Sequence, residues 1–136
     1  MIILDTSVWI EFLKNNPEYF SKVKYLLENQ QVLAIECIFG ELLQGAKNKR
    51  EIEIISLYWE NLPKIIIENG WIQAGIYSSV NKLTSQGVGI IDSFIITSAR
   101  NSNAQIWSLD KKLNSLLKEE ERFNFSLLVF NHKFLK

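Results

Sequence analysis

Ile2-Ile3-Leu4-Asp5-Thr6-Ser7 is a short apolar run that stops abruptly at a carboxylate and two hydroxyl residues. An apolar run of this length that contains β-branched residues predicts a buried strand. After it the pattern changes to a helical period, with Trp9, Phe12 and Leu13 on the apolar side. Ser7 is the expected N-cap of that helix. The chain is therefore predicted to begin with a strand, a carboxylate and a helix.

The rest of the chain repeats this alternation. Further strands are predicted at residues 32–35, 64–67, 105–109 and 127–130. Helices are predicted at residues 17–28, around Phe39 to Leu43, and at residues 52–59, 71–85, 94–99 and 111–117, with Asp92 as the N-cap of the 94–99 helix. Strands separated by helices imply right-handed crossovers and a parallel α/β sheet with helices on both faces.

Composition limits the classes of protein to consider. With 136 residues and 47% hydrophobic content, the chain fits a single domain over residues 1–136. Its 15 basic and 15 acidic residues cancel, so any contact with nucleic acid must be local. No apolar run approaches the roughly 20 residues of a membrane-spanning helix, so we expect no membrane association.

The cysteine and histidine content restricts the chemistry. Cys37 is the only cysteine and no secretory signal opens the chain, so we expect a cytoplasmic protein without an internal disulfide. His132 is the only histidine, which excludes a zinc site built from cysteine and histidine. Any bound metal is therefore expected to have oxygen ligands.

The aspartates are few and specifically placed. Only three occur, at positions 5, 92 and 110, against twelve glutamates. Asp5 and Asp110 follow predicted strands, where ligands bind in open α/β sheets. Glu41 lies on the helix after the second strand, and its neighbours at helical spacing are not polar. Such carboxylates suit Mg²⁺ or Mn²⁺, so we predict that Asp5, Glu41, Asp92 and Asp110 bind one of these ions.

A simpler interpretation exists for each acid. Asp92 and Asp110 both stand where helix capping alone would explain them, and Glu41 could lie on a solvated face. The joint pattern favours a metal site, because carboxylates 4 Å apart repel by roughly 4 kcal/mol per pair at an effective dielectric near 20. A cation offsets that repulsion and can promote in-line attack on a phosphodiester.

Four blocks resemble the PIN domain family, and within it the VapC-type toxins of toxin–antitoxin pairs. They are residues 2–7, 41–46, 92–99 and 106–110. The resemblance implies a doubly wound sheet of about five parallel strands, a Mg²⁺- or Mn²⁺-dependent endoribonuclease, a homodimer and a cognate VapB-type antitoxin. By position it implies that Asp5, Glu41, Asp92 and Asp110 are the catalytic, metal-binding acids. Thr6, Ser7 and Ser108 match hydroxyl positions that support them.

The chain departs from the family pattern after the fourth acid, where Lys112 and Leu113 stand in place of a further Asp or Asn and a Phe. Lys111 and Lys112, beside Asp110, are candidate contacts to RNA phosphates, as is Arg100 on the Asp92 helix. Glu36 is an additional acid, expected to be solvated or capping. Most tryptophans are predicted to pack in the core or a subunit interface, whereas the role of Trp71 is left open.

The sequence lacks the motifs of several other α/β classes. A haloacid dehalogenase-type phosphatase would need a second Asp at position 7, and a receiver domain would need an Asp where Glu68 stands. No phosphate-binding or dinucleotide-binding glycine motif is present. The alternatives that remain are a non-catalytic PIN-like module that binds RNA or protein, and a housekeeping RNA-processing nuclease.

Overall fold

A computed structural model describes residues 1–126 of the chain. Its elements follow the order β1 (Ile2–Leu4), α1 (Thr6–Leu13), α2 (Pro17–Glu28), β2 (Val32–Leu33), α3 (Glu36–Gln44), α4 (Lys49–Asn61), α5 (Gly70–Val80), η1 (Thr84–Gln86), α6 (Ile90–Asn101), β3 (Gln105–Trp107), α7 (Lys111–Ser115) and η2 (Glu119–Glu121). The strand predicted at 127–130 lies outside the described residues.

The sheet is parallel and has β1 at its centre, in the order β2-β1-β3. Ile3 lies opposite Leu33 on one side and Ile106 on the other. Single parallel bridges add Lys64 beside Ala34 and Arg122 beside Ile106, one outside each outer strand. Because β2 pairs with one side of β1 and β3 with the other, the sheet is doubly wound. Its three strands and two bridges match the expectation of about five strands.

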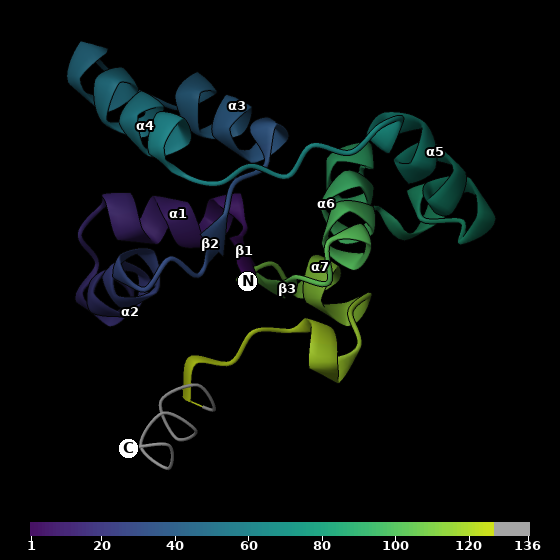
Figure 1. Cartoon of the computed structure of the whole chain (residues 1–136). Helices are drawn as coiled ribbons and strands as arrows, with labels where there is room; N and C mark the ends of the chain where they lie inside the picture. The colour runs from purple at the N-terminus through teal and green to yellow at the C-terminus, as the bar shows by residue number, and fades with distance from the viewer. Residues whose placement is uncertain (127–136) are drawn as a thin grey trace.

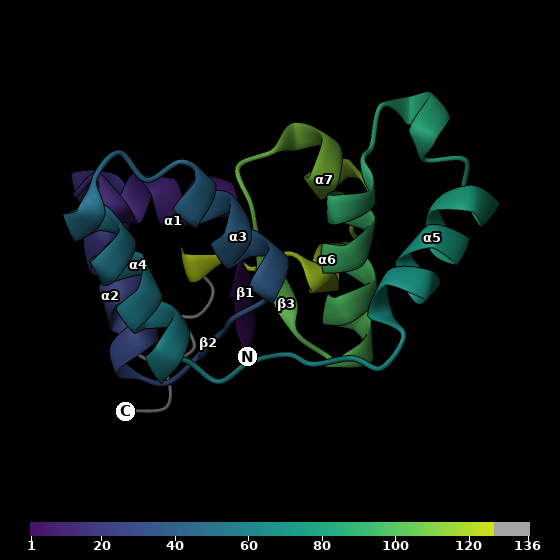
Figure 2. The same cartoon turned by 90° about the horizontal axis from the view of Figure 1, so that it is seen from above.

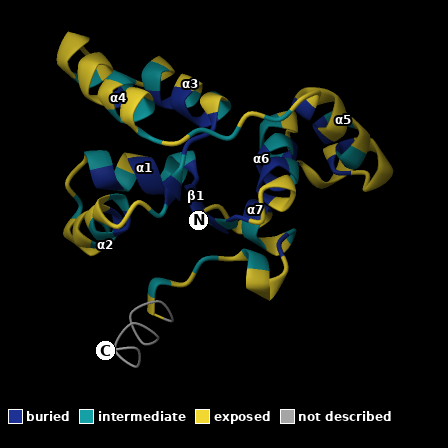
Figure 3. Ribbon diagram, viewed as in Figure 1, coloured by how far each residue is buried: buried dark blue, intermediate teal, exposed yellow. Residues whose placement is uncertain are grey.

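Helices cover the sheet on both sides (Figures 1 and 2). Helices α1 to α4 lie on one side, whereas α6 lies on the other with α5 packed outside it. The buried residues gather between these layers, on β1 and on the inner faces of the helices, as Figure 3 shows. Trp9, predicted to be a core residue, is 1% exposed and meets Phe39 edge-on at 5.3 Å. No helix within residues 1–126 has the length and apolarity needed to cross a membrane.

Several predicted elements are shorter in the structure. The strands predicted at 32–35 and 105–109 end at Leu33 and Trp107, and the helix predicted at 111–117 ends at Ser115. The strand predicted at 64–67 is reduced to the bridge at Lys64, because β2 turns into α3 at Ile35 and leaves no backbone for later residues to pair with. The helix predicted to reach about residue 85 ends at Val80. Lys82 has a φ of 53°, which the helix cannot accommodate, and a 3₁₀ turn follows.

Two predicted helix caps are wrong. Asp5, rather than Ser7, is the N-cap residue of α1, and the Ser7 hydroxyl bonds elsewhere. Helix α6 begins at Ile90 after Gly89, so Asp92 is its third residue instead of its N-cap. Asp110 does cap α7, as its position after a strand suggests.

Candidate active site

Asp5 is held at the carboxyl end of β1. Asp5 is 7% exposed, and its Oδ2 accepts hydrogen bonds from Ser108 Oγ at 2.7 Å and from Ser7 Oγ at 3.1 Å. The Ser7 hydroxyl in turn accepts from the Leu109 amide at 3.0 Å. This arrangement follows from the sheet, because the Asp5 amide donates to the carbonyl of Trp107 and so aligns the ends of β1 and β3. The predicted supporting hydroxyls Ser7 and Ser108 therefore both contact Asp5.

Glu41 reaches the same end of the sheet from α3. Its Oε1 accepts a hydrogen bond from Thr6 Oγ1 at 2.9 Å. Because Thr6 directly follows Asp5 and α3 packs on α1, this bond fixes the longer Glu41 side chain beside the end of β1. Thr6, the third predicted supporting hydroxyl, thus acts on Glu41 and not on Asp5.

Asp110 lies in the connection from β3 to α7 and is exposed. Its Oδ1 accepts from the amides of Lys112 at 2.8 Å and Leu113 at 3.4 Å, which is N-terminal capping. Its own amide donates to Ser108 Oγ at 3.0 Å, so one serine contacts the segments of two predicted ligands. Asn114 Nδ2 donates to the Ser108 carbonyl at 2.8 Å and fixes this connection. No pattern in the sequence pointed to Asn114.

Asp92 lies in the first turn of α6, near enough to the other three acids for their charges to act on it. Burial, and then the charges of Asp110, Asp5 and Glu41 in that order, raise its pKa from 3.8 to about 6. The structure therefore brings the four acids predicted from sequence into one electrostatic cluster, although they come from four separate segments. Within residues 1–126 the Asp92 carboxylate has no hydrogen-bond partner.

The oxygens of this cluster suit a hard cation. Asp5, Glu41 and Asp110 each use one carboxylate oxygen in the bonds described above, and within the described residues the other oxygen accepts none. All these candidate metal ligands are carboxylate oxygens, which Mg²⁺ and Mn²⁺ prefer. As the side chains stand in the described part of the chain, no three of them converge closely enough to enclose a metal ion. Binding by three or more of them would therefore require their side chains to rotate toward one another, which the repulsion among the four charges opposes in the absence of a cation.

Of the predicted RNA contacts, the structure places only the lysines beside the cluster. Lys111 and Lys112 are exposed at the start of α7, directly after Asp110. Arg100 lies near the other end of α6 from Asp92, where its Nε donates to Glu121 Oε2 at 2.8 Å. Its guanidinium also lies over the ring of Tyr77.

Cys37 borders the site but was not predicted to do so. Burial raises the pKa of its thiol to about 12, and the charge of Glu41 is the next largest cause. Cys37 and Glu41 are one turn apart on α3, so their four-residue spacing was the signal that could have placed them together.

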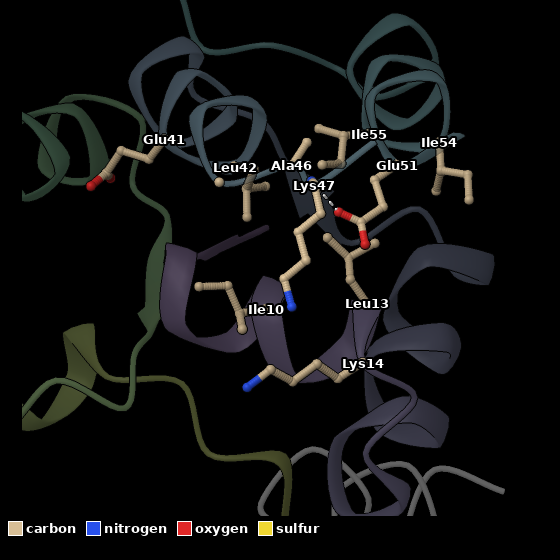
Figure 4. A pocket seen from close by; sticks show the side chains of 11 residues that line it. Ile10, Leu13, Lys14, Glu41, Leu42, Ala46, Lys47, Glu51, Ile54 and Ile55 are labelled. Atoms are coloured by element: carbon tan, nitrogen blue, oxygen red, sulfur yellow. Dashed lines mark hydrogen bonds between the residues drawn. The ribbon is translucent and has the colours of Figure 1, made fainter. Parts of the chain in front are cut away.

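A groove of about 290 Å³ extends from the site between α1, α3 and α4 (Figure 4). Glu41 stands at one end of it, and most of the lining side chains are apolar. Ile10 and Ile54 line it while being 39% and 38% exposed. The Glu51 carboxylate, which accepts from the Lys47 amide, adds a polar group on the α4 side.

The fold and the acidic cluster define a doubly wound α/β protein with a carboxylate site at the carboxyl end of its parallel strands. The family model of the PIN domain matches residues 2–118, and the chain belongs to the PIN domain family. No curated protein sequence matches it significantly.

Solved structures share this fold. A chain of VapBC2 from Rickettsia felis, bound to a DNA fragment from the promoter, has a TM-score of 0.68 and 19% identity over 91% of this chain and 98% of its own. A chain of VapBC-1 from nontypeable Haemophilus influenzae has a TM-score of 0.65 and 22% identity over 93% and 99%. A chain of a toxin–antitoxin complex from Klebsiella pneumoniae has a TM-score of 0.63 and 16% identity over 82% and 88%.

Proposed function

We propose that this protein is a metal-dependent endoribonuclease that hydrolyses RNA phosphodiester bonds, and that it is the toxin of a VapBC-type toxin–antitoxin pair. The observation that carries the proposal is the cluster of Asp5, Glu41, Asp92 and Asp110, in which burial and then the charges of the other three acids raise the pKa of Asp92. Membership of the PIN domain family and the likeness to chains of VapBC complexes support it.

These four acids are the proposed ligands of Mg²⁺ or Mn²⁺. A bound divalent cation would lower the pKa of a coordinated water and compensate charge on the phosphodiester. The chain contributes orientation: Ser108 and Ser7 hold one oxygen of Asp5, and Thr6 holds one oxygen of Glu41. Above its pKa of about 6, Asp92 is ionised and able to act as a ligand.

RNA is proposed to approach over the start of α7. Lys111 and Lys112 are exposed cations next to Asp110, so they can contact phosphates flanking the bond that is cut. The net charge of zero leaves no general attraction to RNA, and these local contacts would therefore matter more than in a basic protein. We propose that the protein acts in the cytoplasm, where such RNA is available.

The groove between α1, α3 and α4 is the proposed docking site for the antitoxin. Its apolar lining fits apolar side chains of a partner segment, and its end at Glu41 would receive a basic side chain that competes for the carboxylates. Ile54→Asp should weaken binding of the antitoxin while leaving RNA cleavage unchanged. Tight binding by this variant, measured by calorimetry, would place the antitoxin elsewhere.

The homodimer also remains a proposal. Ile72, Ile76 and Val80 form an exposed apolar stripe on α5, with exposures of 63%, 61% and 73%. Ile76→Glu should convert a dimer to a monomer if a second copy covers this stripe. Light scattering of both proteins gives the answer, and equal masses would exclude this face.

The decisive experiment is Mn²⁺-dependent cleavage of RNA by the wild type, Asp5→Asn and Glu60→Gln. Asp5→Asn changes a buried acid of the cluster, whereas Glu60→Gln makes the same chemical change on the exposed side of α4. We expect cleavage by the wild type and Glu60→Gln, and none by Asp5→Asn. If the wild type cuts no RNA, a non-catalytic PIN-like binding module becomes the better description.

A housekeeping RNA-processing nuclease would give the same cleavage result. Expression in a bacterial host separates it from a toxin, because a toxin arrests growth and its antitoxin restores it. Growth that is unaffected by the active protein would favour the processing role.

A further inference from the structure

A second cavity, of about 480 Å³, lies beside the acidic cluster. Glu36, Cys37 and Gly40 line it from the first half of α3. The rest of the lining comes from residues 65–67 before α5, from Gly70 and Trp71 at the start of α5, and from Phe94 on α6. Figure 1 shows the α4–α5 connection passing the start of α3 before it reaches α5. A cavity of this size is in the range that holds small organic ligands.

The cavity and the acidic cluster share two helices. Cys37 lines the cavity one turn before Glu41, on the same face of α3. Phe94 lines it from α6, the helix that also carries Asp92. The charges of Glu41 and Asp5 both raise the pKa of the Cys37 thiol, which agrees with this proximity. A nucleotide whose phosphate lies at the acids therefore has this cavity within reach of its base.

An aromatic surface is available in the cavity. The rings of Trp71 and Phe94 stack with centroids 4.1 Å apart and planes inclined at 29°. Trp71 nevertheless remains 49% exposed, so Phe94 covers only part of it. Gly70 makes the stacking possible, because a Cβ at that position would lie 2.9 Å from Phe94 Cε2.

The polar lining favours a base over a phosphate. Glu36 is exposed at the cavity, and a carboxylate accepts hydrogen bonds from an amino group but repels a phosphate. No lysine or arginine within residues 1–126 lines the cavity. An aromatic plane next to a hydrogen-bond acceptor suits an unpaired base, which presents a flat face and donor groups on its edge.

We propose that this cavity binds an unpaired base of the RNA substrate next to the bond that is cut, with the base stacked on Trp71 and its exocyclic amino group donating to Glu36. This inference rests on the proposed function, whose site it extends to a specificity-determining subsite. Adenine, cytosine and guanine carry such an amino group and uracil does not, so the subsite selects against uracil at one position.

Cleavage of a randomised single-stranded RNA in Mn²⁺, followed by sequencing of the product ends, tests the selection. We expect uracil to be depleted at one position flanking the cut. Trp71→Ala should lower kcat/KM by about 10- to 100-fold, which is the usual effect of losing one stacked base, and Trp71→Phe should retain most of the activity. Glu36→Gln should keep the rate within a few fold but lose the depletion of uracil, because an amide can also donate.

Two further variants compare a change inside the cavity with a change outside it. A Cβ at Gly40 meets no atom within 4 Å, so Gly40→Leu extends into open space and should block the base as Trp71→Ala does. Leu57→Ala removes an exposed apolar side chain on α4, outside the cavity and the other proposed interfaces, and should leave rate and base preference unchanged. If the wild type cleaves RNA and the Trp71 and Gly40 variants keep its rate and preference, the base subsite is refuted while the nuclease stands.

A readout without cleavage tests the subsite even if the nuclease proposal fails. Saturation-transfer NMR in chelator measures binding of adenosine and uridine, which have no phosphate and need no metal. We expect a signal for adenosine with the wild type and Leu57→Ala, a weaker one for uridine, and none for either nucleoside with Trp71→Ala or Gly40→Leu. No adenosine signal with the wild type, or an equal signal with Trp71→Ala, would overturn the proposal.

Discussion

Ser108 Oγ donates a 2.7 Å hydrogen bond to Asp5 Oδ2, although the two residues are 103 positions apart in the chain. The same hydroxyl accepts from the Asp110 amide at 3.0 Å. One buried serine therefore sets the orientation of a carboxylate on β1 and the path of the chain that carries another carboxylate after β3.

Ser108→Ala should weaken both the fold and the proposed metal site. The loss leaves a buried carboxylate oxygen with one hydrogen bond fewer, which costs about 1–3 kcal/mol of unfolding free energy. Removing a group that orients a ligand typically costs 10- to 100-fold in metal affinity. Ser115→Ala is the matched control, because its hydroxyl bonds only to the Lys112 carbonyl at an exposed helix end. Urea unfolding and Mn²⁺ titration measure the two effects, and equal results for both variants would contradict the role of Ser108.

The pKa of Asp92 predicts how the metal-free protein responds to pH. Burial and then the neighbouring acids raise this pKa from 3.8 to about 6. Between about pH 4 and pH 6 the unfolded chain loses the proton while the folded chain keeps it, so stability should fall as pH rises through this window. Asp92→Asn should remove that part of the slope and be more stable than wild type at pH 7, by about 1 kcal/mol after allowance for partial exposure. Melting temperatures of both proteins, measured in chelator between pH 4 and pH 6, check this. If the two proteins show the same dependence on pH, the ionisation of Asp92 does not destabilise the fold.

Bound metal should make the wild type more stable than Asp92→Asn, which reverses their order in chelator. At about 100 times its dissociation constant, Mn²⁺ should stabilise the wild type by roughly 2.7 kcal/mol if the unfolded chain does not bind it. Asp92→Asn and Asp5→Asn lack a proposed ligand and should gain much less. Melting temperatures with Mn²⁺ and with chelator provide the comparison, and an equal gain in all three proteins would place the ion away from the cluster.

Arg100 is expected to support the fold and not RNA binding. Its ion pair with Glu121 is partly exposed, so Arg100→Ala should cost at most about 1 kcal/mol. The side-chain hydrogen bond from Arg100 lowers the pKa of Glu121, so this contribution is present above the ordinary pKa of 4.5 and is lost as pH falls below it. RNA cleavage should be unchanged in Arg100→Ala, whereas replacing Lys111 and Lys112 with alanine should weaken RNA binding and flatten its salt dependence. Salt titrations of RNA binding decide between these assignments.

The local sequence pattern predicted those features that depend on a single segment of the chain. The apolar run before Asp5 predicted β1, and the position of Asp110 after a strand predicted its capping of α7. The local sequence pattern gave wrong predictions where the end of a helix or strand depends on contacts with another segment. The strand predicted from Lys64 ends at one bridge because β2 has already turned away, and Ser7 does not cap α1 because its hydroxyl bonds to Asp5 and to the Leu109 amide.

The order of strands and helices could be predicted from periodicity, and a site of four acids with oxygen ligands could be predicted from residue type, position and the resemblance to the PIN domain family. The pairing of each hydroxyl with its acid, the ion pair of Arg100 and the stacking of Trp71 on Phe94 could not be predicted and arise from the packing of the folded chain. Those contacts join residues that are 21 to 103 positions apart or lie on different helices. Their geometry is set by how the layers pack, which no local pattern encodes.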